Sequence, residues 1–184
     1  MDKLFVIFNP AARGEKSRRV RRFLETKIGL SVTLAPTQSA GDAKLLAARA
    51  VAEGWRVVVA AGGGGVPVIA DENGILSGVP AVIDKDLASA VLAREIRADL
   101  LVISTSVERV FLNFGQPGQR ALSSMTVAEA RQYTTEGHFK PGSMLPKIEA
   151  CLQFIENGGR EAVITCPAAL SKALDGQTGT RIVP

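Results

Sequence analysis

The stretch RVVVAAGGGGVP, residues 56–67, joins a run of β-branched residues to four consecutive glycines. An apolar run without polar alternation is typical of a strand that is buried on both faces, as in a parallel sheet. Glycine tolerates positive φ and lets the backbone approach a phosphate closely. We therefore predict a buried strand over 56–60 and a sharp turn over 62–65 at the carboxyl edge of a sheet, where open α/β sheets bind ligands. A tight turn with a purely structural role is the alternative.

Outward from this stretch, short apolar strands alternate with longer segments of helical period, which is typical of a parallel sheet covered by helices. Strands are predicted at 4–8, 31–35, 100–103, 162–165 and 181–183. Helices are predicted at 15–28, 42–53, 85–97, 127–133, 143–157 and 168–174, with Asp42 and Ser143 as N-caps. The Asn73-Gly74 pair predicts one hairpin and residues 110–114 a second. We expect one α/β domain over residues 1–184, a three-layer α/β/α sandwich with a mainly parallel sheet.

Composition argues against several classes of function. The chain has 184 residues, 46% of them hydrophobic, and no apolar run approaches the roughly 18 residues of a membrane span. Its start lacks the pattern of a signal peptide, so we expect a cytoplasmic protein with no membrane partner. The net charge is +4, but the basic residues are scattered apart from Arg18–Arg22. Apolar residues interleave with these arginines at helical spacing, which favours the solvated face of a helix over a nucleic-acid-binding patch. With aromatic residues at only 5%, no nucleic-acid partner is expected.

Cysteine and histidine usage predicts no metal site. Cys151 and Cys166 do not have the spacing of metal ligands and are expected to be small buried hydrophobes. His138 is the only histidine and has no companion ligands near it in the sequence, so a structural role is expected.

From Gly62 onward a series of motifs resembles the C-terminal part of carbamate kinase, within the amino acid kinase superfamily. These motifs are GGGGVPV at 62–68, AVIDKDLA at 81–88, FLNFG at 111–115, EGHF at 136–139, GSM at 142–144, PK at 146–147 and GQTGT at 176–180. They follow one another in the order of that family over about two-thirds of the chain. A full carbamate kinase is much longer, and its first glycine loop has no counterpart in this sequence.

The first part of the chain resembles a different family. Asn9-Pro10, Gly14, APT at 35–37, GDA at 41–43 and VVVA at 57–60 are similar to the start of the diacylglycerol kinase catalytic domain. That family continues with Gly-Gly-Asp-Gly-Thr, whereas Gly64 and Val66 stand at the aspartate and threonine positions here. We therefore interpret the chain as an engineered or recombined hybrid with a junction near 58–65, one segment covering 1–63 and the other 62–184. A divergent natural protein is the alternative.

The carbamate kinase resemblance implies a site for ADP or ATP with Mg²⁺. Lys85 would neutralise the transferred phosphoryl group, Asp86 would position other charged groups, and Lys147 would contact the nucleotide phosphates. The nucleotide-binding set implied by the resemblance comprises Gly62, Gly63, Gly64, Gly65, Thr105, Ser106, Val107, Phe111, Gly142, Ser143 and Met144. Ser106 stands where the family usually has an aspartate. Each feature also has a structural alternative: capped helix starts with surface lysines, and a core position for Phe111.

Three functions follow from these patterns. The first is a nucleotide-binding phosphotransferase domain that acts between ADP and a small phosphorylated substrate, carbamoyl phosphate, with little or no turnover because the first glycine loop lacks a counterpart. The second is a non-catalytic α/β scaffold, and the third is a lipid kinase similar to diacylglycerol kinase. The carbamate kinase resemblance also implies a homodimer, which an unsupported sheet edge would favour.

Overall fold

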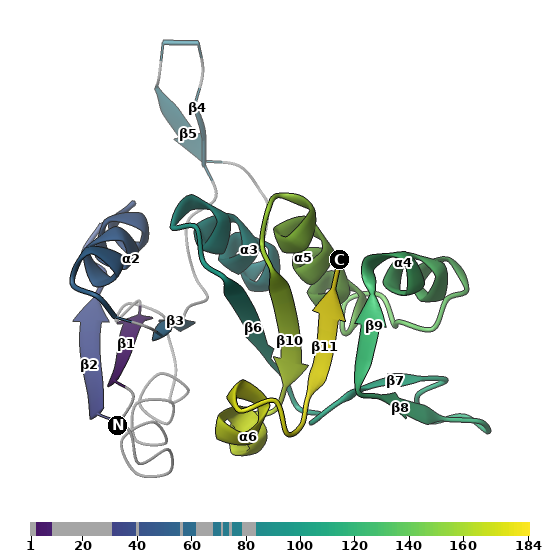
Figure 1. Cartoon of the computed structure of the whole chain (residues 1–184). Coiled ribbons are helices and arrows are strands. Elements are labelled where there is room, and N and C mark those ends of the chain that lie inside the picture. Colours follow the sequence, from purple (N-terminus) through teal and green to yellow (C-terminus); the bar gives the residue numbers. More distant parts are fainter. Residues whose placement is uncertain are drawn as a thin grey trace. The chain divides into compact units, whose positions relative to one another are not determined.

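The computed structural model describes residues 3–8, 31–39, 41–55, 57–61, 68–70, 72–73, 75–78 and 84–184 (Figure 1). The chain divides into two compact units, Met1–Lys85 and Asp86–Pro184. The single domain predicted over residues 1–184, with its junction near 58–65, stays a prediction. The predicted helix at 15–28, the Asn9-Pro10 turn and the glycine turn at 62–65 lie outside the described residues.

The first unit contains a parallel three-stranded sheet in the order β2 (Ser31–Pro36), β1 (Lys3–Phe8), β3 (Val57–Ala61). The central strand carries the buried side chains of Phe5, Val6 and Ile7. Helix α2 (Asp42–Ala52) packs against β1 through two buried alanines, which let the helix approach the strand closely. The three strands predicted for this region are confirmed, and each run contains the β-branched or aromatic residues that favour strands.

The start of α2 corrects one expectation. The N-cap residue is Gly41, which has a φ of 89°, and Asp42 is the first residue of the helix. The Asp42 carboxylate accepts hydrogen bonds from the backbone N–H groups of Gln38 and Ser39, at 2.6 and 2.8 Å, instead of from the helix. These bonds, with Gln38 first, lower the pKa of the Asp42 carboxyl group. The aspartate therefore fixes the turn that leads into the helix.

A short hairpin follows in the same unit. Strands β4 (Val68–Ala70) and β5 (Leu76–Gly78) are antiparallel, with Val68 opposite Gly78. The antiparallel pairing confirms the hairpin predicted from the Asn73-Gly74 pair, and Gly74 itself lies outside the described residues.

The second unit has a four-stranded sheet in the order β6 (Leu100–Ser104), β10 (Glu161–Thr165), β11 (Thr180–Val183), β9 (Ser124–Thr126). The pairs β6–β10 and β11–β9 are parallel, and β10–β11 is antiparallel. Four of the five residues of β10 are buried, as expected for an inner strand. Strand β9 was not predicted, because three residues are too few to show a period.

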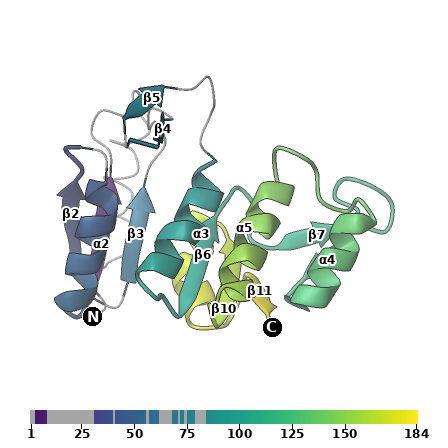
Figure 2. The ribbon, with the colours of Figure 1, turned by 90° about the horizontal axis from the view of Figure 1, so that it is seen from above.

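Helices cover both faces of this sheet. The helices α3 (Lys85–Glu95), α5 (Leu145–Glu156) and α4 (Val127–Thr135) lie side by side (Figure 2). Their core residues, among them Ala90, Ile148 and Phe154, form one cluster with alternate residues of the strands: Leu101, Ile103, Ala162, Ile164 and Ile182. Val163 lies on the other face, where the 3₁₀ turn η1 (Pro167–Ala169) is followed by α6 (Leu170–Leu174). The predicted α/β fold is confirmed.

Among the helices in the described parts of the chain, none is long and apolar enough to cross a lipid bilayer.

A second hairpin joins this sheet through one hydroxyl group. Strands β7 (Val110–Leu112) and β8 (Arg120–Leu122) are antiparallel, which confirms a hairpin in this region and extends it beyond the predicted residues. The Thr180 hydroxyl accepts a hydrogen bond from the Val110 N–H (2.8 Å) and donates one to the Leu122 carbonyl. Thr180 is fully buried, so water cannot replace either bond.

We expect Thr180→Val to destabilise the protein by about 2–3 kcal/mol, because the variant leaves the Val110 N–H and the Leu122 carbonyl without this partner. Thr180→Ser keeps the hydroxyl and loses one methyl group, which costs about 1 kcal/mol. Urea unfolding measures both free energies. An equal loss in the two variants would contradict a structural role for the hydroxyl.

Candidate functional site

Two helix starts meet at one edge of the second unit's sheet. Helix α3 leads into β6 and helix α5 leads into β10 after only four intervening residues each, so both helices run antiparallel to these strands. Because an 11- or 12-residue helix is about as long as a five-residue strand, both N-termini lie near the carboxyl ends of β6 and β10. Asp86 is in the first turn of α3 and Lys147 in the first turn of α5.

These two side chains form an ion pair. Lys147 Nζ lies 2.7 Å from Asp86 Oδ2, and the exposed fractions of the lysine and aspartate side chains are 13% and 8%. Removing two charges from water is costly, and their mutual attraction offsets that cost only when both partners remain. A buried pair is therefore weak support for stability by itself, and its position at the ligand-binding edge of an α/β sheet favours a functional role.

The charges of this ion pair also affect the pKa of the nearby Cys151 thiol. Burial raises the pKa of the Cys151 thiol above its ordinary value, the Asp86 carboxylate raises it further, and the Lys147 ammonium opposes the shift. Cys151 lies four residues after Lys147, which places it one helical turn below the ion pair on the same side of α5. The expectation of a small buried hydrophobe is confirmed for Cys151, whereas Cys166 is only half-buried.

The residues around the pair form the start of each helix. Lys85 is the exposed first residue of α3 and precedes Asp86 directly. Gly142 has a φ of 69°, and Ser143 is exposed in the turn before α5. Met144 is half-buried against the core and is the N-cap residue of α5, so the prediction that Ser143 caps this helix is wrong. Pro146 in the first helical turn needs no hydrogen-bonding N–H, which explains how the helix begins without a polar cap.

The predicted base-contacting segment follows the carboxyl end of β6. Thr105 is half-buried and its N–H donates to the Thr165 carbonyl (2.8 Å), while Ser106 is exposed and Val107 half-buried. Phe111 is half-buried in β7, and its ring lies 5.7 Å from the ring of Phe114, which is 63% exposed. The role predicted for Phe111 stays a prediction.

Two links between this segment and the chain's last loop were missed by sequence reasoning. The Thr178 hydroxyl donates to Glu108 Oε1, and Thr180 holds Val110 as described above. The GQTGT motif at 176–180 was the available signal, but the 70 residues that separate the partners leave no local pattern for their contact.

The phosphate-binding turn predicted at Gly62, Gly63, Gly64 and Gly65 lies outside the described residues and stays a prediction. In the ranges that the structure describes, no three His, Cys, Asp or Glu side chains gather as a metal site would require. His138 packs edge-on against Tyr133, and its Nε2 lies 3.2 Å from Glu136 Oε2.

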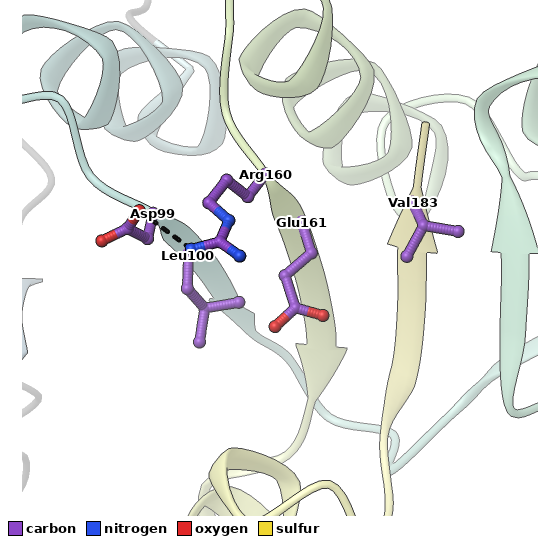
Figure 3. Close-up of a pocket in the computed structure, with 5 residues that line it drawn as sticks. All are labelled: Asp99, Leu100, Arg160, Glu161 and Val183. Atoms are coloured by element: carbon purple, nitrogen blue, oxygen red, sulfur yellow. Dashed lines mark ion pairs between the residues drawn. The ribbon is translucent and has the colours of Figure 1, made fainter.

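A surface hollow of about 420 Å³ lies elsewhere, lined by Asp99, Leu100, Arg160, Glu161 and Val183 (Figure 3). These residues mark the amino ends of β6 and β10, the sheet edge opposite to Ser104 and Thr165. Its Arg160–Asp99 pair is 3.7 Å long, with side chains 81% and 82% exposed. The hollow is therefore separate from the predicted site, and a solvated pair of this kind contributes little energy.

Comparisons with known proteins give one consistent family. The sequence profile of the amino acid kinase family matches residues 25–166. Carbamate kinase-like protein YahI of Escherichia coli is 56% identical over 127 residues, covering 69% of this chain and 40% of YahI. Carbamate kinase of Thermococcus kodakarensis is 51% identical over the same shares of the two chains. The structure of carbamate kinase from Giardia lamblia bound to AMP-PNP has a TM-score of 0.68 and 36% identity, covering 78% of this chain and 43% of that one.

The chain spans about two fifths of the length of the curated relatives it matches. The family match begins at residue 25, on the N-terminal side of the junction predicted near 58–65.

We expect Lys147→Met to destabilise the protein by about 3 kcal/mol, because it leaves the Asp86 carboxylate buried without its partner. The double variant Asp86→Asn, Lys147→Met should lose at least about 1 kcal/mol less than the sum of the single variants. Urea unfolding at pH 7 gives the four free energies of this cycle. Arg160→Ala serves as the control, with an expected loss below about 0.5 kcal/mol. Additive single losses would contradict the coupling.

A thiol reagent at pH 8 should label Cys166 in the native protein and reach Cys151 only on unfolding, because the thiolate is the reactive form and burial disfavours it at Cys151. The time course of labelling, compared between the native protein and the protein in urea, measures this difference. Equal rates for both thiols in the native state would contradict the burial of Cys151.

Proposed function

The chain belongs to the amino acid kinase family, and from this premise we propose that it is a carbamate-kinase-like phosphotransferase domain that binds ADP or ATP beside Asp86 and Lys147. One observation carries the assignment of the site: a buried acid–base pair at the starts of two helices, at the carboxyl edge of a mainly parallel sheet.

Phosphoryl transfer suits such a site, because the protein has to position the reactants and neutralise charge with little covalent chemistry. In the proposed reaction, an oxygen of the ADP terminal phosphate bonds to the phosphorus of carbamoyl phosphate, and the bond from that phosphorus to the carbamate oxygen breaks. The negative charge spreads over the oxygens of the phosphoryl group in transit. Lys147 and Lys85 are proposed to face these oxygens.

Asp86 is proposed as the residue that positions Lys147. A lysine side chain has several rotatable bonds, and holding its ammonium group in place before the substrate arrives removes a reorganisation cost from the reaction. The 2.7 Å bond to Asp86 Oδ2 provides this restraint while leaving two of the three ammonium protons for other acceptors.

Nucleotide contacts are proposed for the surrounding loops. Gly142, Ser143 and Met144 precede α5, and a helix start favours anions through its free N–H groups and dipole. Thr105, Ser106, Val107 and Phe111 are proposed near the base and ribose, and Gly62–Gly65 near the phosphates.

Mg²⁺ is proposed to bind together with the nucleotide phosphates, since Mg²⁺ commonly binds phosphates together with one or two carboxylates. Asp86 is one carboxylate at this site, and its Oδ2 is already engaged by Lys147.

The other hypotheses differ from this proposal in what they predict. A non-catalytic scaffold would fold and bind no nucleotide, and a lipid kinase similar to diacylglycerol kinase would require a role for the first segment. The family match from residue 25 favours the amino acid kinase family on both sides of the predicted junction. The hybrid origin, the low turnover and the homodimer stay predictions. An assay for ATP formed from ADP and carbamoyl phosphate measures turnover directly.

We expect calorimetric titration with ADP and Mg²⁺ to give saturable binding, and Lys85→Ala to weaken it about tenfold or more, since a charged hydrogen bond to phosphate is lost. Lys172→Ala, which removes an exposed lysine of α6, is the matched control and should leave the affinity unchanged.

Adenosine distinguishes a phosphate contact from a general effect on the site, because it has no phosphate for Lys85 to meet. Its affinity should be the same for the parent and Lys85→Ala. Failure of the parent to bind ADP at millimolar concentration, in a protein that unfolds cooperatively, would sink the proposed function.

A further inference from the structure

We propose that the hydrogen bond between Thr178 and Glu108 fixes the loop of residues 105–109 for the base side of the nucleotide, which makes Glu108 and Thr178 positioning residues of the site. This inference rests on the proposed function, because it concerns the loop to which base contacts are assigned there. We call this hydrogen bond the clasp.

The loop is attached to the fold at both ends. At its beginning the Thr105 N–H donates to the Thr165 carbonyl at 2.8 Å, which continues the pairing of β6 with β10. At its end the Val110 N–H donates to the Thr180 hydroxyl, also at 2.8 Å. The four residues between these anchors, 106–109, are bends without helix or strand pairing.

The clasp is the hydrogen bond that holds the middle of the loop. The Thr178 hydroxyl donates to Glu108 Oε1, and residues 106–109 make no other hydrogen bond within the described part of the chain. Val107 and Arg109 are half-buried, so packing also restrains the loop, whereas Glu108 is exposed and is restrained by this hydrogen bond. Loss of the clasp would therefore let the middle of the loop sample more conformations.

The Thr178 side of the clasp is rigid. Thr178 is only 9% exposed, and the neighbouring backbone is fixed by bonds from the Gln177 N–H to the Lys172 carbonyl (2.8 Å) and from the Gly176 N–H to the Ala173 carbonyl (3.1 Å). Gly179 has a φ of 85°, and a side chain there would press on Val163 and the Ile164 carbonyl. This platform therefore holds Thr178 in place, whereas Glu108 is an exposed loop residue.

An acceptor with a full negative charge makes the bond stronger than one between neutral groups. Without the clasp the loop would lose conformational entropy when the nucleotide binds, and the affinity for the nucleotide would fall accordingly. Lys147 and Asp86, on the phosphate side of the site, belong to other elements, so loss of the clasp should not change the binding of phosphate groups there.

The test measures three affinities by calorimetry, for ADP, adenosine and inorganic tripolyphosphate, in the parent and in Thr178→Val, Thr178→Ser and Glu108→Ala. We expect Thr178→Val and Glu108→Ala each to weaken ADP and adenosine about tenfold and to leave tripolyphosphate unchanged. The double variant should be no weaker than either single variant. Thr178→Ser keeps the hydroxyl and should bind ADP like the parent.

Thr134→Val is the matched control, because it removes another partly buried threonine hydroxyl, which donates to the Ala130 carbonyl at 2.8 Å. This control should leave all three affinities unchanged. Glu108 is exposed, so Glu108→Ala keeps the test available if Thr178→Val does not fold.

The outcomes separate the two proposals. A parent that binds ADP, with unchanged affinities in Thr178→Val and Glu108→Ala, contradicts the clasp and leaves the proposed function standing. Equal losses for adenosine and tripolyphosphate also contradict the clasp, because they indicate a general loss of structure. A parent that binds none of the three ligands contradicts the proposed function, and the clasp falls with it.

Discussion

Parallel pairing of β6 with β10 is the constraint on which the second unit depends. Two parallel strands can be neighbours only if the chain returns to its starting edge of the sheet between them, and α5 makes that return before β10. Helix α3 runs in the same direction before β6. Because each helix ends at the amino end of its strand, both helix starts lie at the opposite, carboxyl edge. Residues 61 positions apart in the sequence, Asp86 and Lys147, thereby come within 2.7 Å.

The same topology explains why a charged pair can persist in a largely apolar environment. The strands and helices behind it form a continuous core of aliphatic and aromatic side chains, which excludes water from the pair. In such surroundings an unpaired charge is costly, so each charge fixes the position of the other. A lysine held in this manner would meet an incoming phosphate with little loss of side-chain freedom, as the proposed phosphoryl-transfer site requires.

Short-range sequence patterns predicted the elements better than their ends. The strands at 4–8, 100–103 and 162–165 were found because a strand buried in a parallel sheet is a nearly continuous apolar run in the sequence, and the edge strand at 31–35 was found from its β-branched residues. The caps of two helices were assigned wrongly: Asp42 bonds backward to Gln38 and Ser39, and α5 begins at Leu145 after Met144. Polar residues near a helix start can serve either the helix or the turn before it, and residue type alone does not separate these uses.

The sequence by itself determined the α/β class, most of the strands and helices, and the charged residue types Lys85, Asp86 and Lys147 at predicted helix starts, because these depend on local period and local chemistry. Only the tertiary structure decided which of them meet. The Asp86–Lys147 pair and the Glu108–Thr178 hydrogen bond each join residues more than 60 positions apart, and such contacts are fixed by strand order and helix packing, not by any pattern within a short window.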